Sequence, residues 1–185
     1  MPQLSMAKAT ARHIDYLCAL QKYIKGDDIM LYIAYGSNMN RSQMDYRCPN
    51  SYVVCNGKLK GYKLVFNYHA DVIKTNNEND IVPVVVWNIA DNDWGRLDVY
   101  EGYPSYYVKE TVNVILDNGN IEKAIVYVMA NNRKGVCPPL QSYFDCIYEG
   151  YIESGIDVKY LYDALEYSFD NKTKYNKYKM KEMIK

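Results

Sequence analysis

LYIAYGSNM, residues 31–39, is an apolar run that ends in a polar turn. Its first five residues, 31–35, have the length and composition of a buried β-strand. Gly36, Ser37 and Asn38 stop that strand, and the backbone N–H groups of such a turn can converge on an anion. A plain strand-to-helix connection also fits the spacing. No lysine follows the glycine, so the turn does not have the pattern of a nucleotide-binding P-loop.

Further along the chain, two pairs of segments alternate between apolar and polar residues, as paired strands do. Residues 52–59 and 62–68 are expected to form one such pair. Residues 106–116 and 121–129 are expected to form the other. They flank Asp117-Asn118-Gly119-Asn120, which is typical of a hairpin turn.

Between these pairs lies the apolar stretch 81–89, which predicts a central strand. Pro83 must lie near its start or its edge, because proline has no amide proton for a sheet ladder. The preceding residues, 69–80, are polar and rich in asparagine, so we expect a loop there.

Helical patterns fill much of the remaining chain. Asn40 can cap a short helix, and Asp91 can cap a second one that carries Trp94, Leu97 and Val99 toward the core. The expected helical spans are 40–46, 91–101, 140–153 and 158–167. Because strands come first and helices last, the sequence predicts an α+β fold.

The chain is expected to divide into three parts. Residues 1–29 form an appendage, in which Thr10 can cap a helix that ends at Gly26. Residues 30–168 form the main domain, and residues 169–185 form a lysine-rich C-terminal tail. A solvated chain end explains that tail more simply than nucleic-acid binding does.

Charge and hydropathy exclude several partners. The chain has 22 basic and 22 acidic residues, so no net charge draws it to nucleic acid or to an anionic membrane. No apolar stretch approaches the length of a membrane span, and the N-terminus lacks the order of a signal peptide. We therefore expect a cytoplasmic protein that takes no nucleic acid or membrane as its partner.

Cysteine and histidine usage narrows the chemistry further. Five cysteines at wide spacing, with no C-x-x-C pair, suit reduced thiols better than a disulfide framework or a zinc site. Only two histidines are present, His13 and His69, which excludes most metal sites and most histidine-based triads. These counts therefore favour chemistry that does not depend on a histidine or cysteine metal site.

Glu101 is the strongest single candidate for chemistry. It lies in LDVYEGYP, residues 97–104, where glycine and proline end a helix among tyrosines. These surroundings could raise the pKa of its carboxyl group and make it a proton carrier near neutral pH. A surface glutamate beside a turn is the plain alternative.

Two other catalytic arrangements stay open at this point. Asp98 lies three residues before Glu101, so the two could act as the paired carboxylates of a glycosidase. Ser37 could act as a nucleophile with His69 as its base, which would make the protein an esterase or amidase.

Three motifs, in this order and spacing, resemble those of the gamma-glutamylcyclotransferase-like superfamily. The first is Tyr35-Gly36-Ser37-Asn38-Met39, and the second is Glu101-Gly102-Tyr103-Pro104 with Tyr107 behind it. The third is Pro138-Pro139 ahead of Tyr143. With its asparagine, the first motif resembles the loop of the bacterial branch that carries YGSN. The resemblance therefore disfavours glutathione as the substrate.

The resemblance covers residues 30–167 and implies both a fold and a reaction. The fold would be a small mixed β-barrel with peripheral and C-terminal helices and a pocket at one end. The reaction would cyclise a small-molecule gamma-glutamyl substrate to 5-oxoproline and release a free amine. No metal and no cofactor would be required, because the substrate supplies its own attacking amine. A binding module on the same fold is the alternative, and the oligomeric state is left open.

The resemblance also assigns roles to individual residues. Glu101 would face the α-amine as general acid/base, and backbone amides of the turn would hold the α-carboxylate. Tyrosine hydroxyls would donate hydrogen bonds to substrate oxygens. The expected substrate-binding residues are Tyr35, Gly36, Ser37, Asn38, Met39, Tyr107 and Tyr143.

Overall fold

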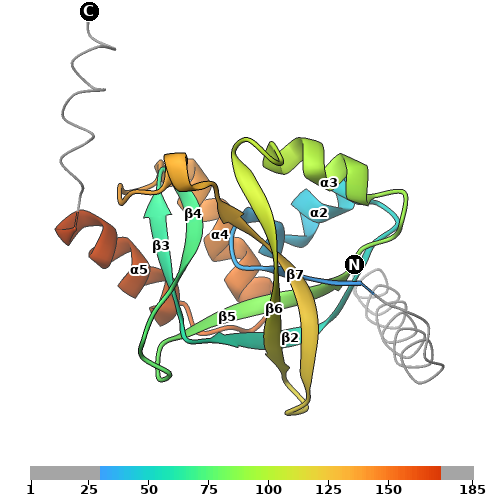
Figure 1. Ribbon diagram of the computed structural model, residues 1–185, viewed down its shortest axis with the longest axis horizontal. Helices are drawn as coiled ribbons and strands as arrows, with labels where there is room; N and C mark the ends of the chain where they lie inside the picture. The colour runs from blue at the N-terminus through green and yellow to red at the C-terminus, as the bar shows by residue number, and fades with distance from the viewer. Residues whose placement is uncertain (1–29, 172–185) are drawn as a thin grey trace, which may run out of the picture.

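The computed structural model describes residues 30–171 (Figure 1). The expected N-terminal helix, with Thr10 and His13, and the lysine-rich tail after residue 171 lie outside the described residues. The three-part division of the chain therefore stays a prediction.

A closed five-stranded β-barrel forms the centre of the described chain. Its strands follow one another around the barrel as β1, Leu31–Ala34, β5, Ile81–Asn88, β2, Tyr52–Lys60, β6, Tyr107–Leu116, and β7, Ile121–Met129. β1 closes the barrel, because it pairs antiparallel with β5 on one side and parallel with β7 on the other. The mixed α+β barrel fold expected from the sequence is confirmed.

The burial of β1 and β5 explains why their sequences are continuous apolar runs. All four residues of β1 are buried, and residues 82–87 of β5 are buried as well. A strand that is covered on both faces has no polar side to alternate with. β1 pairs with β5 only from Val85 onward, so Pro83 lies in the part of β5 whose ladder runs with β2 alone. Its place near the strand start agrees with the prediction.

The pairing expected for residues 52–68 is wrong. β2 pairs with β5 and β6, whereas β3, Tyr62–Asn67, leaves the barrel and pairs with β4, His69–Lys74, in a separate two-stranded sheet. The expected loop at 69–80 therefore contains a strand. Its polar composition is misleading because Asp71 is buried, and its Oδ1 accepts a hydrogen bond from the backbone N–H of Met129 at 2.9 Å. That bond ties β4 to the end of β7.

Helices cover one side and one end of the barrel (Figure 1). α5, Lys159–Asp170, packs on β3, and α4, Gln141–Glu153, packs on the 3₁₀ turn η1, Ser37–Met39. α2, Arg41–Arg47, and α3, Trp94–Glu101, contact each other, and a short 3₁₀ turn, η2, follows β7 at Asn131–Arg133. Asn40 caps α2 as expected, since its Oδ1 accepts from the backbone N–H of Gln43. In the part of the chain described here, no helix is long and apolar enough to cross a membrane.

α3 differs from the prediction in its start and in its buried face. It begins after Asp93, whose carboxylate does not cap the helix but accepts from the backbone N–H of Asn50 and the hydroxyl of Ser51. Leu97 is fully buried, but Val99 is 82% exposed, because residues two apart point to different sides of a helix. Glu101 follows Leu97 by four residues and so lies on the inward side.

Gly150 sets how closely α4 approaches the turn η1. A Cβ atom added there would lie 2.7 Å from the backbone carbonyl carbon of Met39 and 2.7 Å from the backbone nitrogen of Asn40. Such contacts are too short to persist, so α4 can lie against the turn only because residue 150 has no side chain.

We expect Gly150→Ala to lower the free energy of unfolding by about 1 to 3 kcal/mol, because the added methyl group forces α4 away from η1. Gly95→Ala is the matched control: Gly95 is an exposed helical glycine of α3 with nothing within 4 Å of an added Cβ. That variant should gain roughly 0.5 to 1 kcal/mol. Urea unfolding of both variants measures the two changes, and equal stability of both would contradict the close packing of α4.

Candidate active site

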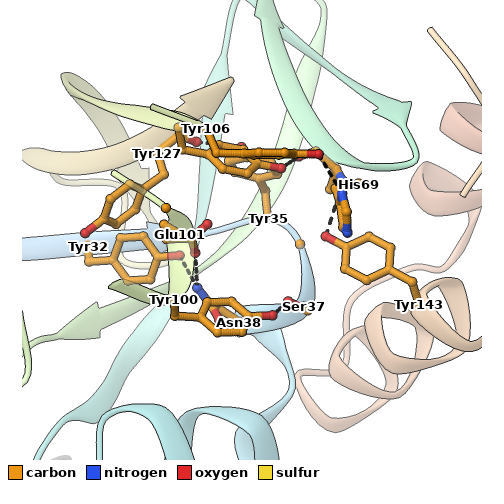
Figure 2. Close-up of a pocket in the computed structure, with 14 residues that line it drawn as sticks. Tyr32, Tyr35, Ser37, Asn38, His69, Tyr100, Glu101, Tyr106, Tyr127 and Tyr143 are labelled. Atoms are coloured by element: carbon orange, nitrogen blue, oxygen red, sulfur yellow. Dashed lines mark hydrogen bonds between the residues drawn. The ribbon is translucent and has the colours of Figure 1, made fainter. Parts of the chain in front are cut away.

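A cavity of about 350 Å³ lies where the turn after β1 meets the end of α3 (Figure 2). Its wall is drawn from β1, η1, β4, α3, β6, β7 and α4, and it is mainly aromatic. The lining residues are Tyr32, Tyr35, Gly36, Ser37, Asn38, His69, Ala70, Tyr100, Glu101, Gly102, Tyr106, Tyr107, Tyr127 and Tyr143. Its volume suits a small molecule.

Gly102 fixes the position of Glu101 at the end of α3. Its φ of 63° is in the left-handed region, and its backbone N–H bonds back to the carbonyl of Val99. A side chain at this position would be strained, and its Cβ would lie 3.0 Å from Cβ of Tyr106. The helix therefore ends sharply at Glu101, with its carboxyl group facing the cavity.

The carboxyl group of Glu101 is held against the turn that follows β1. Its Oε1 accepts a hydrogen bond from Nδ2 of Asn38 at 2.7 Å (Figure 2). Burial raises the pKa of Glu101 to about 7; the Asn38 hydrogen bond and the charge of Arg47 lower the pKa, and Asp98 raises it. Removal from water outweighs the other influences. Near neutral pH the group can therefore both accept and donate a proton.

Asn38 uses both ends of its side-chain amide. Nδ2 donates to the hydroxyl of Tyr32 at 2.8 Å as well as to Glu101. Oδ1 accepts from Nη1 of Arg47 at 2.5 Å. Burial raises the pKa of Tyr32 well above its ordinary value, so its hydroxyl stays neutral.

The turn uses two of its backbone amides in its own hydrogen bonds. The N–H of Met39 donates to the carbonyl of Gly36 at 2.9 Å, and the N–H of Asn40 donates to the carbonyl of Ser37. Ser37 and Asn38 come first in the turn, and their N–H groups precede those that the turn consumes. Met39 is fully buried and does not line the cavity. The expectation that it presents an amide to a ligand is therefore not supported.

Tyr107 and Tyr143 bind the same residue of β4 from two sides. The hydroxyl of Tyr107 donates to the carbonyl of Ala70 at 2.6 Å, and the N–H of Ala70 donates to the hydroxyl of Tyr143 at 3.2 Å. In its bond with Ala70, the Tyr143 hydroxyl is an acceptor, so its O–H can still donate to a ligand. The O–H of Tyr107 already donates to the carbonyl of Ala70. Burial raises the pKa of both hydroxyls, so both stay neutral. Of the two expected donors, the geometry favours Tyr143.

Ser37 and His69 have different hydrogen-bond partners. The hydroxyl of Ser37 lies 3.2 Å from that of Tyr100, and it accepts from Nη1 of Arg47 at 3.1 Å. Nδ1 of His69 lies 3.0 Å from the hydroxyl of Tyr106. His69 is exposed as expected, but it belongs to a strand instead of a loop, and it lines the cavity. The esterase arrangement gains no support.

Asp98 is engaged away from the cavity. Lys109 forms an ion pair with it at 2.7 Å, and the hydroxyl of Tyr127 donates to its Oδ1 at 2.5 Å. It does not line the cavity beside Glu101. The two carboxylates are therefore not placed as the pair that a glycosidase needs.

Several lining residues carried no assigned role in the sequence. Tyr100 and Gly102 flank Glu101 in its own motif, and Tyr32 belongs to the strand before the turn, so proximity in sequence could have indicated these three. Tyr106 and Tyr127 come from the hairpin of β6 and β7, and only the closed barrel brings them to the cavity. Arg47, behind the wall, had no local signal at all.

Comparison with known proteins finds a family and several relatives. The family model described as "Gamma-glutamyl cyclotransferase, AIG2-like" matches residues 32–145. The human protein named gamma-glutamylcyclotransferase is 28% identical over 145 residues, which covers 72% of this chain and 76% of the relative. A solved structure titled gamma-glutamyl cyclotransferase has a TM-score of 0.66 at 26% identity, and covers 74% of this chain and 86% of its own. YkqA from Bacillus subtilis has a TM-score of 0.63 at 20% identity, covers 83% of this chain and 59% of its own, and shows likeness of fold alone.

The chain belongs to the gamma-glutamyl cyclotransferase, AIG2-like family. The match begins within β1 and ends within α4, so it includes the turn, Glu101 and Tyr143. The resemblance carried by the three motifs is confirmed. The human relative and the first solved structure carry the name of an enzyme, and the protein is accordingly an enzyme of the cyclotransferase class.

Glu101 should make the free energy of unfolding depend on pH. Its pKa of about 7 in the folded protein lies above the ordinary value of 4.5. Between about pH 4.5 and 7 the folded state holds a proton that the unfolded state lacks, so stability falls as pH rises through this range. Glu101→Gln removes this loss. We expect it to match the parent protein near pH 4.5 and to exceed it by roughly 2 to 3 kcal/mol above pH 7.

Urea unfolding across that pH range measures the difference. Glu110→Gln, which neutralises an exposed carboxylate of β6, is the control and should not show the gain in stability above pH 7 that is expected of Glu101→Gln. A difference for Glu101→Gln that does not vary with pH would mean that its carboxyl titrates as it does in water.

Proposed function

We propose that the protein cyclises a gamma-glutamyl amine or gamma-glutamyl amino acid to 5-oxoproline and releases the free amine, with Glu101 as general acid/base. The observation that carries this proposal is the 2.7 Å contact between Glu101 and Asn38. In this contact a carboxyl group with a pKa of about 7 lies beside a turn whose first residues line the same cavity. Family membership supports the same reaction class.

The proposed reaction needs a base because the α-amine of the substrate arrives as ammonium. Glu101 takes one proton, and the freed nitrogen then bonds to the γ-carbonyl carbon. The bond from that carbon to the leaving nitrogen breaks as Glu101 returns the proton there. Over the whole reaction two ammonium protons pass to the leaving nitrogen, which departs as ammonium, and one stays on the ring nitrogen. General acid/base catalysis of this kind contributes about 10²- to 10⁴-fold in rate.

Orientation would supply much of the remaining rate enhancement. The amides of Ser37 and Asn38 would hold the α-carboxylate, and the hydroxyl of Tyr143 would donate to a substrate oxygen. Anchoring both ends of the glutamyl group folds its flexible chain, so that the nitrogen meets the carbonyl carbon within one molecule. Tyr35 would contact the substrate only through its ring, since its hydroxyl already donates to the backbone carbonyl of Tyr127. We keep the sequence-based expectations of a cytoplasmic location and of a substrate other than glutathione as part of this proposal.

The decisive assay is release of 5-oxoproline from a panel of gamma-glutamyl amines and amino acids. We expect Glu101→Gln to lower kcat/KM by about 10²- to 10⁴-fold, because the amide cannot carry the proton. For the parent protein, kcat/KM should rise with pH to a plateau, with its midpoint near the pKa of about 7, since only the carboxylate form is a base.

Glu110→Gln, with an exposed carboxylate outside the cavity, should match the parent protein. Equal turnover by Glu101→Gln would remove Glu101 from the mechanism. If the parent protein binds gamma-glutamyl ligands but forms no product from any of them, the binding-module alternative replaces the proposed reaction.

A further inference from the structure

Arg47 lies behind the cavity wall and connects three elements. It is the last residue of α2, and its Nη1 donates to Oδ1 of Asn38 at 2.5 Å and to the hydroxyl of Ser37 at 3.1 Å. Its Nη2 donates to Oε1 of Gln43 at 2.7 Å. Its guanidinium carbon lies 3.6 Å from the centroid of the Tyr100 ring, next to Glu101 on α3. A planar fork with donors on several sides suits this position, and lysine would not.

The chemistry of the amide gives Arg47 control over Asn38. A side-chain amide has an accepting end and a donating end, and half a turn exchanges the two. Arginine only donates, so Oδ1 of Asn38 must face Arg47. The two N–H bonds of Nδ2 then point to Glu101 and Tyr32. The flipped amide would set oxygen against the carboxylate and NH₂ against the guanidinium.

We infer that Arg47 is a positioning residue: through the Asn38 amide it holds the Glu101 carboxyl group beside the turn that would bind the substrate carboxylate. This inference rests on the proposed role of Glu101 and extends it to a residue outside the cavity lining. Arg47 forms no hydrogen bond with the carboxyl group and does not line the cavity, so it positions Glu101 through Asn38 and Ser37, whereas its charge acts on Glu101 across space.

The charge of Arg47 lowers the pKa of Glu101, as the hydrogen bond from Asn38 does. Burial raises the pKa of the Cys48 thiol and lowers that of His69, and it raises the pKa values of five tyrosine hydroxyls, so these groups are neutral near pH 7. The five are Tyr32, Tyr35, Tyr107, Tyr127 and Tyr143. Asp98 adds a negative charge that its ion pair with Lys109 offsets. Titratable or charged groups either line the cavity with Glu101 or act on it electrostatically. They are Tyr32 of β1 with Tyr35 after it, Arg47 of α2 with Cys48 after it, His69 of β4, Asp98 and Tyr100 of α3, Tyr107 of β6 with Tyr106 before it, Tyr127 of β7 and Tyr143 of α4.

Two substitutions of Arg47 test this role in the activity assay. Arg47→Gln loses both the charge and the fork, and it should move the midpoint of the acid limb of kcat/KM upward by about 0.5 to 1 pH unit. It should also lower kcat/KM at the plateau by roughly tenfold or more, chiefly through kcat, because the carboxyl group loses its fixed position. Arg47→Lys keeps the charge without the fork, so it should restore the midpoint but not the plateau.

Arg96→Gln is the matched control. It removes the same charge from the same region, where Arg96 donates to the backbone carbonyls of Arg47 and Tyr46 and makes no contact with Asn38. Its midpoint and plateau should match those of the parent protein. A change in Arg96→Gln equal to that in Arg47→Gln would reduce Arg47 to a support of α2 and overturn the inference.

A double-substitution cycle tests the route through Asn38. If Arg47 acts on Glu101 by way of this amide, Asn38→Ala with Arg47→Gln should lose no more of kcat than Asn38→Ala alone loses. Losses that multiply would show that Arg47 works independently of Asn38, against the inference.

Direct titration of the Glu101 carboxyl carbon by NMR tests the coupling without any substrate. Its midpoint should rise in Arg47→Gln and stay unchanged in Arg96→Gln. An unchanged midpoint in Arg47→Gln overturns the role of Arg47 even if the enzyme is active. Absence of product from every gamma-glutamyl compound would instead defeat the proposed function, and the titration would still decide whether Arg47 governs Glu101.

Discussion

The side-chain amide of Asn38 makes the contacts on which the rest of the site depends. It joins the turn after β1 to Glu101 of α3 and to Arg47 of α2. A carboxyl group withdrawn from water loses its hydration, and a fixed N–H donor replaces part of what is lost. Burial therefore raises the pKa of Glu101 to about 7 without leaving the group unpartnered. Near neutral pH such a group can both accept and donate a proton, as the proposed reaction requires.

The barrel and its helices hold that amide in place. β1 is paired on both sides, so the turn that follows it starts from a fixed point. α4 rests on the turn because Gly150 allows close contact, and α3 ends at Glu101 because Gly102 adopts a left-handed backbone. These elements keep the carboxyl group and the turn at one separation, which is what the proposed reaction within one folded substrate would require.

Local sequence patterns predicted the elements whose burial follows their own periodicity. The buried strands β1 and β5, the hairpin of β6 and β7 and the Asn40 cap all agree with the structure. The prediction was wrong at β4, where a loop was expected because the segment is polar. Its Asp71 is buried and accepts a hydrogen bond from the backbone of Met129, a residue distant in sequence. It was also wrong for Val99, where residue type alone suggested an inward side chain.

The sequence by itself determined the fold class and the family. Its three motifs also contain many of the residues that line the cavity, because each motif is a short segment. Only the tertiary structure decided how they meet. Glu101 and Asn38 are 63 residues apart, and their contact exists because barrel closure brings the turn to the end of α3. The partners of Tyr107 and Tyr143, the removal of Met39 from the cavity and the place of Arg47 behind Asn38 were decided in the same way. Hydrogen-bond direction and burial depend on neighbours in space, and local sequence does not encode them.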